Sequence, residues 1–150
     1  MLIPSRRRVL ALCALSLALA GTGAHAGEPP PDFKVIAHAA RPDTKVGRAF
    51  LADAFLKNVT RWADNENVHP VDQRPNTAVR RRFSESVLKR SVPAVKTYWQ
   101  QRIFSGRGVP PPELDSDEAV VRWVEEHPGA VGYINGSASA GRTKVLAVVP

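Results

Sequence analysis

Cysteine is almost absent from this chain. Cys13 is the only one among 150 residues, and it lies in a short apolar run near the N-terminus. The remaining sequence therefore has no thiol for a disulfide or a thiolate metal site. Histidine is also scarce, and His38, His69 and His127 lack the close spacing of zinc ligands. We therefore expect no metal and no cofactor.

Residue patterns that carry catalysis are missing as well. No serine stands in a Gly-x-Ser-x-Gly context. Asp115, Asp117 and Glu118 fall at the expected start of a helix, where carboxylates are favoured by the helix dipole. The glycines around Arg107 are not followed by the lysine and hydroxyl of a P-loop. We predict no catalytic residues and conclude that the chain is not an enzyme.

The N-terminal segment has the organisation of a secretory signal peptide. Arg6, Arg7 and Arg8 precede an apolar run over residues 9–20, which is too short for a permanent membrane span. Small residues at Ala24 and Ala26 predict cleavage after Ala26. A lipoprotein site is excluded because Leu12, before Cys13, is not small. Export by the general secretory route is favoured, and twin-arginine export stays an alternative.

Three parts follow from this assignment: a signal peptide over residues 1–26, a proline-rich tether over 27–32 and one domain over 33–150. Without the signal peptide, the chain has 18 basic and 14 acidic residues, a net charge of +4. A basic exported protein meets anionic solutes and envelope polymers rather than nucleic acid. We therefore predict a periplasmic location and no nucleic-acid partner.

The hydrophobic pattern after residue 32 predicts a mixed succession of four strands and four helices. The strands are expected at 33–38, 68–72, 131–134 and 143–149. Pro70 places the second of these at a sheet edge or a bulge. Four helices are expected. The first is capped by Thr44 and buries Val46, Phe50 and Ala54, and the second is capped by Asn76 or Thr77 and buries Val79, Phe83 and Val87. The third is capped by Ser91 and buries Val95, Trp99 and Ile103, and the fourth begins at Asp115. This order suits an α/β fold, a three-layer sandwich around a mixed central sheet.

Three segments of the domain carry a resemblance to a known family. They are Phe55–Trp62, Val68–Gln73 with Phe83 in the helix that follows, and Pro128–Ile134. Together they resemble the second lobe of the phosphate-type periplasmic solute-binding proteins of ABC transporters. The resemblance covers most of the chain after residue 33. It implies a single lobe of that fold, with phosphate or another small oxyanion as ligand and an ABC permease among the partners.

The resemblance also implies a binding site at the start of the second helix. In the family, an arginine precedes the sequence Asp-Gly-Ser-Gly-Thr, whose amides and hydroxyls hold the anion at a helix N-terminus. Matching Phe83 to the family phenylalanine places Thr77 at the serine, Ala78 at the glycine and Val79 at the threonine. Gln73 then falls at the arginine, with Arg74 beside it, and Pro75 replaces the aspartate. The implied ligand-binding residues are Gln73, Arg74, Asn76, Thr77, Ala78 and Val79.

Simpler explanations exist for each of these features. Asn76 or Thr77 is explained equally by capping of its helix. Ser105, Gly106 and Arg107 can form either an anion-binding nest or a turn before three prolines. Arg80, Arg81 and Arg82 are expected on the outer face of their helix, as a solvated surface or a secondary site for an anion or partner. The alternative function is therefore a ligand-free periplasmic interaction module, and a homo-oligomer that rebuilds the missing lobe stays open.

Overall fold

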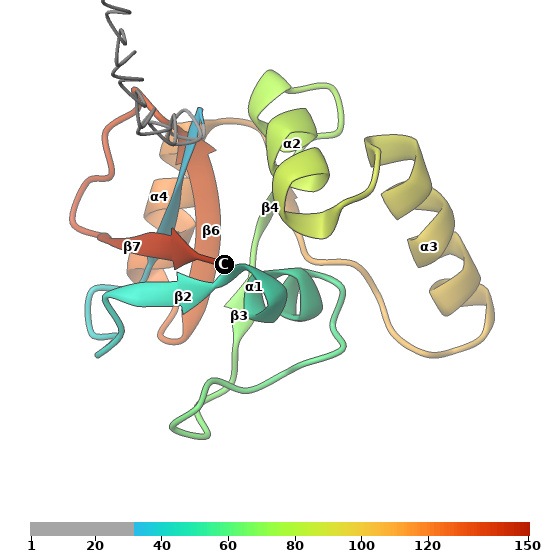
Figure 1. Cartoon of the computed structure of the whole chain (residues 1–150), viewed down its shortest axis with the longest axis horizontal. Coiled ribbons are helices and arrows are strands. Elements are labelled where there is room, and N and C mark those ends of the chain that lie inside the picture. Colours follow the sequence, from blue (N-terminus) through green and yellow to red (C-terminus); the bar gives the residue numbers. More distant parts are fainter. Residues whose placement is uncertain (1–31) are drawn as a thin grey trace, which may run out of the picture.

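The computed structural model of the chain describes residues 32–150. The predicted signal peptide and most of the predicted tether lie outside the described residues. A mixed sheet forms the centre, with its five strands in the order β2-β7-β1-β6-β3 (Figure 1). These strands are β1 (Phe33–Ala37), β2 (Lys45–Gly47), β3 (His69–Pro70), β6 (Ala130–Asn135) and β7 (Lys144–Val149). A second, two-stranded sheet pairs β4 (Asp72–Gln73) with β5 (Glu113–Leu114).

The central strand β1 runs against all the others in the five-stranded sheet. It pairs antiparallel with both β6 and β7, so that Val35 lies opposite Tyr133 on one side and Leu146 on the other. The outer strands β2 and β3 pair parallel with β7 and β6. The carboxyl ends of β3 and β6 therefore lie at the same edge, and the chain continues from β3 through β4 into the second helix.

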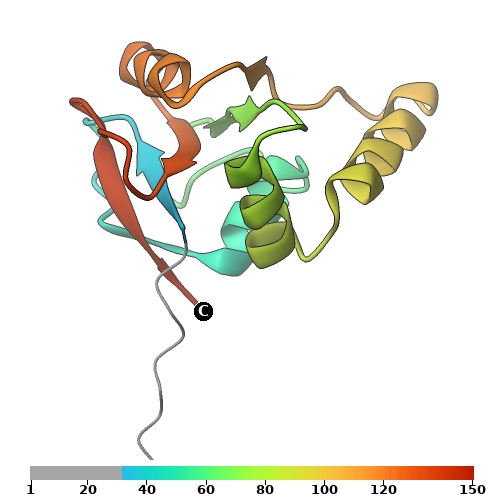
Figure 2. The same cartoon turned by 90° about the horizontal axis from the view of Figure 1, so that it is seen from above.

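Helices cover both faces of the sheet, which gives the three layers expected from the sequence (Figures 1 and 2). The helices are α1 (Arg48–Phe55), α2 (Ala78–Phe83), α3 (Val92–Phe104) and α4 (Asp117–Glu126), and a π-helical segment, Ser84–Leu88, continues α2. The alternation of β6 divides the core: Val131 and Tyr133 pack with α1 and α2, whereas Ala130 and Ile134 pack with α4. No helix within residues 32–150 is long and apolar enough to span a membrane.

The predicted start of the first helix is wrong. Residues 45–47 form β2, and α1 begins only at Arg48 with Gly47 as its N-cap. The reason is the parallel pairing of Val46 with Val148, which adds an edge strand to the sheet. The spacing of Val46, Phe50 and Ala54 matched a helical stripe by coincidence, because only the later part of the stripe is helical.

Smaller corrections concern the other helices and the strand at residues 68–72. That strand is divided into β3 and β4, which belong to different sheets, and Pro70 does lie at the edge of the larger one. Ser116, not Asp115, caps α4 by accepting a hydrogen bond from the Ala119 amide at 3.1 Å. Ile103, expected in the core, is 50% exposed, because α3 projects from the body of the molecule (Figure 2).

Gly132 on β6 allows α4 to approach the sheet closely. A Cβ atom at this position would lie 2.8 Å from side-chain carbons of both Val120 and Val71. Real Cβ atoms do not tolerate such contacts, so any larger residue would push α4 away from the sheet. The glycine therefore fixes the spacing between these two layers.

A buried ion pair connects β4 to α2. The carboxylate of Asp72 pairs with the guanidinium of Arg80, and the hydroxyl of Tyr133 donates to the same carboxylate. Arg80 also donates to the Gln73 carbonyl at 3.3 Å. The Tyr133 ring stacks on Phe83, with ring centroids 3.9 Å apart. One network thus joins β4, β6 and α2 in the core.

Burial and charge oppose each other in this network. Burial raises the pKa of Asp72, although the charge of Arg80 and the hydrogen bond from Tyr133 favour its carboxylate form. Burial alone would lower the pKa of Arg80, but the charge of Asp72 keeps that pKa above its ordinary value. Burial and the neighbouring carboxylate raise the pKa of Tyr133 well above its ordinary range, so the phenol stays protonated and donates. The network depends on all its members being present.

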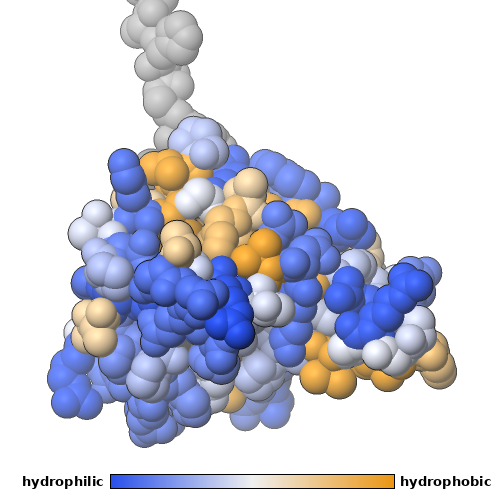
Figure 3. Space-filling model, turned by 90° about the horizontal axis from the view of Figure 1, so that it is seen from below, coloured by the Kyte–Doolittle hydropathy of each residue, from blue (hydrophilic) through white to orange (hydrophobic). Residues whose placement is uncertain are grey.

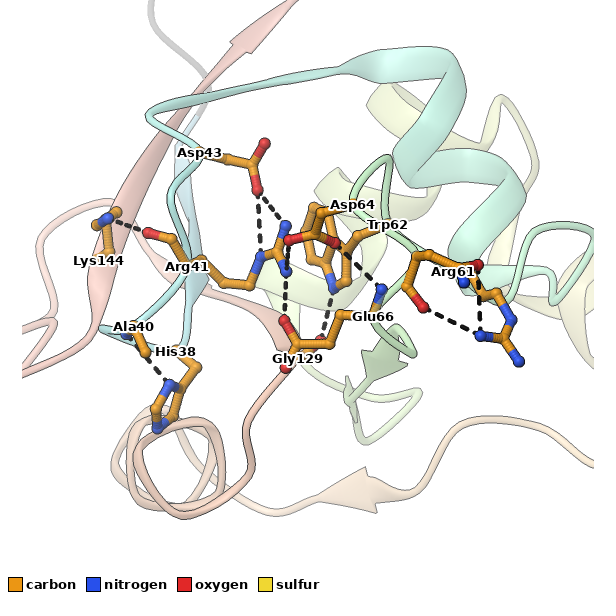
Figure 4. Close-up of polar contacts among 11 residues, drawn as sticks. His38, Ala40, Arg41, Asp43, Arg61, Trp62, Asp64, Glu66, Gly129 and Lys144 are labelled. Carbon is orange, nitrogen blue, oxygen red and sulfur yellow. Dashed lines mark hydrogen bonds and ion pairs between the residues drawn. The ribbon is translucent and has the colours of Figure 1, made fainter.

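A second buried arginine holds the loop that follows α1 (Figure 4). Arg41 is 2% exposed and pairs with Asp43, with Glu66 and, at 2.9 Å, with Asp64. Its guanidinium carbon lies 4.4 Å from the ring centroid of Trp62. The loop is thereby fixed against the connection between β1 and β2, from which Arg41 extends.

We predict that Asp72→Asn destabilises the fold severely. The substitution leaves the Arg80 charge buried without a counter-charge, which costs about 3–5 kcal/mol of unfolding free energy. Urea denaturation measures this loss, with Asp115→Asn as a control for the same chemical change at an exposed site. A loss below about 1 kcal/mol would show that water reaches Arg80 and that the pair is not a structural constraint.

The Arg41 cluster predicts a specific acid sensitivity. A hydrogen bond from the Glu66 amide, joined by Arg41, holds the pKa of Asp64 below its ordinary value. A depressed carboxyl pKa stabilises the fold above the pKa of the unfolded chain, and this stability is lost as pH falls through the folded pKa. The difference in unfolding free energy between the wild type and Asp64→Asn should therefore be largest near neutral pH and shrink below about pH 4. Glu113→Gln is the control, and a pH-independent difference would contradict the assignment.

Candidate functional site

The residues implied by the resemblance form a turn between β4 and α2. Thr77 caps α2 by accepting a hydrogen bond from the Arg80 amide at 3.2 Å, as the simpler explanation of this residue predicted. The same hydroxyl donates to the carbonyl of Arg74 at 3.1 Å. The Thr77 side chain is therefore committed to the turn itself.

Gln73 is committed to the interior. Its side-chain amide donates to Asp117 at 2.7 Å and to the Tyr133 carbonyl at 3.1 Å, and the residue is 2% exposed. Asp117 also accepts from the Asn135 amide at 3.1 Å. Gln73 thus joins the ends of β4, β6 and α4 and has no free donor for an anion. At this position the structure uses the glutamine as a connection within the protein.

The backbone of the turn offers the donors that the side chains do not. The amides of Asn76, Ala78 and Val79 make no hydrogen bond to any group in residues 32–150. Asn76 and Ala78 are exposed, whereas the side chain of Val79 is buried in the core. Three amides at the beginning of a helical segment are a favourable environment for negative charge.

Arg74 adds a positive charge to the turn, but it has an acidic partner. Its guanidinium pairs with Asp115, which lies just before α4. The two side chains are 59% and 66% exposed, so water screens the pair. Exposed pairs of this kind contribute about 0–1 kcal/mol, so an anionic ligand can compete with Asp115 for the guanidinium.

The three consecutive arginines of α2 do not share one face, contrary to the expectation from the sequence. Arg80 is 3% exposed and belongs to the buried network, whereas Arg81 and Arg82 are exposed. Arg82 pairs with Asp32 at 3.3 Å. Arg80 points inward because Asp72 supplies a buried counter-charge, which the alternation of apolar residues does not reveal. The outer surface of α2 therefore carries two arginines.

Ser105, Gly106 and Arg107 form the end of α3 and the turn that follows it. Ser105 donates its hydroxyl to the Gln101 carbonyl at 2.9 Å, and the Arg107 carbonyl accepts from Arg102 at 3.3 Å. Gly106 has a φ of +67°, which a glycine adopts without strain. These contacts are those of a helix terminus and support the turn rather than a nest.

A groove between α2 and α3 is a feature that no sequence pattern predicts. It has a volume of about 930 Å³, and most of its surface is apolar, with contributions from Val95, Trp99, Ile103 and Pro110. Pro75 and Asn76 of the turn lie at its border. Figure 3 shows hydrophobic side chains along the projecting segment that contains α3. The groove exists because α3 projects from the body, and hydrophobic periodicity does not predict how far a helix stands from its neighbours.

The groups gathered at the turn and the groove are suited to binding. Within residues 32–150 no group of three or more His, Asp or Glu side chains is arranged to hold a metal ion. The available functions are amide donation at the turn, positive charge from Arg74 and Arg81, and apolar contact in the groove.

Comparison with solved structures identifies the fold. The chain superposes on a phosphate ABC transporter substrate-binding protein from Clostridium perfringens, solved with bound phosphate, with a TM-score of 0.62 and 16% sequence identity over 78% of this chain and 44% of that one. An ABC-type phosphate transport receptor from Vibrio cholerae gives a TM-score of 0.60 and 16% identity over 78% and 46%. PstS from Borrelia burgdorferi gives 0.55 and 10% identity over 78% and 47%.

The match is one of structure rather than of sequence. No protein-family model and no curated protein matches the sequence. The chain spans less than half the length of each of these three solved structures. It therefore has the fold of one lobe of the phosphate-type ABC transporter substrate-binding proteins.

Proposed function

We propose that this chain is an exported solute-binding lobe that binds phosphate or a similar small oxyanion at the turn between β4 and α2. The ligand would lie on the amides of Asn76, Ala78 and Val79, with Arg74 as the neighbouring cation. The observation that carries the proposal is that these three amides lack acceptors in residues 32–150 at the exposed start of a helical segment. The choice of phosphate is supported by the phosphate-transport proteins that share the fold, one of them solved with bound phosphate.

The position of the turn also supports this function. In open α/β sheets, ligands bind beyond the carboxyl ends of the strands. The turn follows β4, and the start of α4 lies beside it, held by the hydrogen bond from Gln73 to Asp117. The anion would therefore lie at the edge of the sheet at which binding is expected, in a periplasmic protein that delivers its ligand to a phosphate ABC permease.

The structure also sets a limit on affinity. The side-chain donors of Thr77 and Gln73 and the Nη1 group of Arg80 bind groups of the protein itself, and Asp115 competes with the ligand for Arg74. A single lobe leaves the anion open to water, so binding should be weak and should depend on salt.

The competition between Asp115 and phosphate for Arg74 can be tested by substitution. Asp115→Asn frees Arg74 and removes a negative charge beside the turn, so phosphate should bind roughly two- to fivefold more tightly, as expected for an exposed ion pair. Arg74→Ala should weaken binding. Both are measured by titrating the purified chain with phosphate in a calorimeter at moderate salt.

Arg142→Ala is the matched control for the loss of one positive charge. Arg142 is an exposed arginine paired with Glu125 at 3.1 Å, away from the turn. Binding that changes equally in Arg74→Ala and Arg142→Ala would show that net charge alone attracts phosphate. That result, or saturable binding that Asp115→Asn leaves unchanged, would refute the site.

A second candidate function is a periplasmic interaction module that has the fold without the ligand. One observation favours it: Phe104, at the end of α3, is 91% exposed, and Val109 in the following loop is 61% exposed. Apolar side chains that gather in an exposed patch are typical of contact surfaces, and Figure 3 shows such side chains on the projecting segment. The partner would be another periplasmic protein or a second copy of this chain.

Phe104→Ser separates the two candidates. For an interaction module, the variant should lose a partner retained by the wild type from periplasmic extract, or should lose self-association measured by light scattering, while phosphate binding is unchanged. Arg81→Glu with Arg82→Glu tests the arginine surface in the same way, and Arg80 is left intact because it is buried. A monomer that retains no partner would exclude this second function.

A further inference from the structure

The segment around α3 carries positive charge without any acidic residue. Residues 86–112 contain no aspartate or glutamate, whereas the whole chain has 14 acidic residues. The nearest acidic residues along the chain, Glu85 and Glu113, belong to the π-helical segment after α2 and to β5. A segment of this composition attracts an anionic surface. Its basic residues are Lys89, Arg90, Lys96, Arg102 and Arg107.

These positive charges are available to a partner. Within residues 32–150, none of the five basic side chains forms an ion pair with a carboxylate. Four of them are exposed, and the fifth, Arg102, is half-buried. The guanidinium of Arg102 donates to the hydroxyl of Tyr98 at 2.8 Å and to the Arg107 carbonyl at 3.3 Å. Both acceptors are neutral, so the charge of Arg102 stays uncompensated.

The projecting end of α3 exposes apolar side chains beside these charges (Figure 2). Phe104 and Val109 are exposed, and Ile103 is half-exposed. We call these three residues the apolar tip. Arg102 and Arg107 belong to the same end of the helix, because the Arg107 amide donates to the Arg102 carbonyl at 2.8 Å. Since so little of the Phe104 side chain is buried, it contributes little to the stability of the fold.

A lipid bilayer suits the apolar tip better than a folded protein does. The tip stands out from the body, so a protein partner would need a matching pocket. The boundary between headgroups and acyl chains accepts apolar side chains without a preformed pocket. Basic residues next to an inserted tip lie at the level of the headgroups, where each adds attraction to anionic lipid. A second copy of the chain fits less well, because two segments of the same positive charge repel each other.

We propose that the projecting end of α3 binds the surface of a bilayer that contains anionic phospholipid. The apolar tip enters the boundary between headgroups and acyl chains, and Arg102 and Arg107 contact the headgroup phosphates. The proposal rests on the surface of the second candidate function, with lipid instead of protein as the partner. It does not depend on the oxyanion site at the turn.

Flotation with lipid vesicles measures this binding. The exported chain is used, from which residues 1–26 are expected to have been removed, because the apolar run at residues 9–20 would itself bind lipid. Vesicles of equal parts phosphatidylglycerol and phosphatidylcholine should bind the chain saturably. Vesicles of phosphatidylcholine alone should bind it more weakly by roughly tenfold or more. Binding to the anionic vesicles should weaken as the salt concentration rises.

A matched pair of valine variants locates the apolar contact. Val109→Ser and Val145→Ser remove the same side chain, the first from the tip and the second from β7, where Val145 is 48% exposed. Val109→Ser should weaken binding to the anionic vesicles by roughly threefold or more, and Val145→Ser should leave it unchanged. Phe104→Ser, which removes a larger exposed side chain, should weaken binding by roughly tenfold or more.

A matched pair of arginine variants locates the charge. Arg107→Gln should weaken binding to the anionic vesicles by roughly fivefold, as expected for one basic residue at a membrane surface. Arg142→Gln removes the same charge from an exposed arginine outside the segment around α3 and should leave binding nearly unchanged. Arg74→Ala should also leave it nearly unchanged, which separates headgroup phosphate at the tip from free phosphate at the turn.

Four results would overturn the proposal. The first is the absence of saturable binding to the anionic vesicles. The second is an equal loss within either matched pair, because general surface properties would then explain the binding. The third is a loss in Arg74→Ala as large as that in Arg107→Gln, which would place the headgroup at the turn. The fourth is a periplasmic protein retained through Phe104 without any vesicle binding, which would assign the tip to a protein partner and support the second candidate function.

Discussion

The buried pair of Asp72 and Arg80 is the constraint on which the rest of this structure depends. It fixes the direction of α2 relative to β4, and Tyr133 ties the pair to the centre of the sheet. Because Arg80 lies in the first turn of α2, three residues after Thr77, the pair also fixes where the helix begins and hence the direction in which the amides of the turn point. Replacement of a buried pair by apolar residues is often neutral, whereas loss of one member is costly. The network therefore determines how β4, β6 and α2 are arranged more than it adds to the stability of the fold.

The same network determines what is left for a ligand. Arg80 and Gln73 are the basic and amide side chains next to the turn, and both are used inside the protein. The backbone and the exposed side chains of Arg74 and Asn76 face solvent at this position. The fold of a phosphate-type lobe is therefore present with a site built from amides and one peripheral cation.

Much of the fold could be predicted from the sequence, because a strong local pattern of residues indicates whether a segment is a strand or a helix and where it ends. The alternation at Phe33–Ala37, the cap at Thr77 and the edge position of Pro70 are local signals, and the structure confirms them. Predictions failed where a distant partner decides the outcome. Val46 pairs with β7, far along the chain, and Arg80 is buried only because Asp72 lies opposite it.

The candidate site was predicted only in part, for a similar reason. Its position followed from the resemblance, whereas the commitment of Gln73 to Asp117 depends on how β4 and α4 meet in space. The groove beside α3 could not be predicted, since Ile103 fits the helical stripe whether or not another element covers it. Spacing between elements is a property of packing, which a pattern of apolar residues does not contain.

The central claim is that the backbone of the turn is the oxyanion site. Titration of the isotope-labelled chain with phosphate, followed by the amide signals in nuclear magnetic resonance spectra, tests this claim most directly. The account predicts saturable shifts at the amides of Asn76, Ala78 and Val79, with smaller changes at Arg142, a surface arginine outside the turn. Shifts that are uniform over the basic surface, or that leave these three amides unchanged, would contradict it.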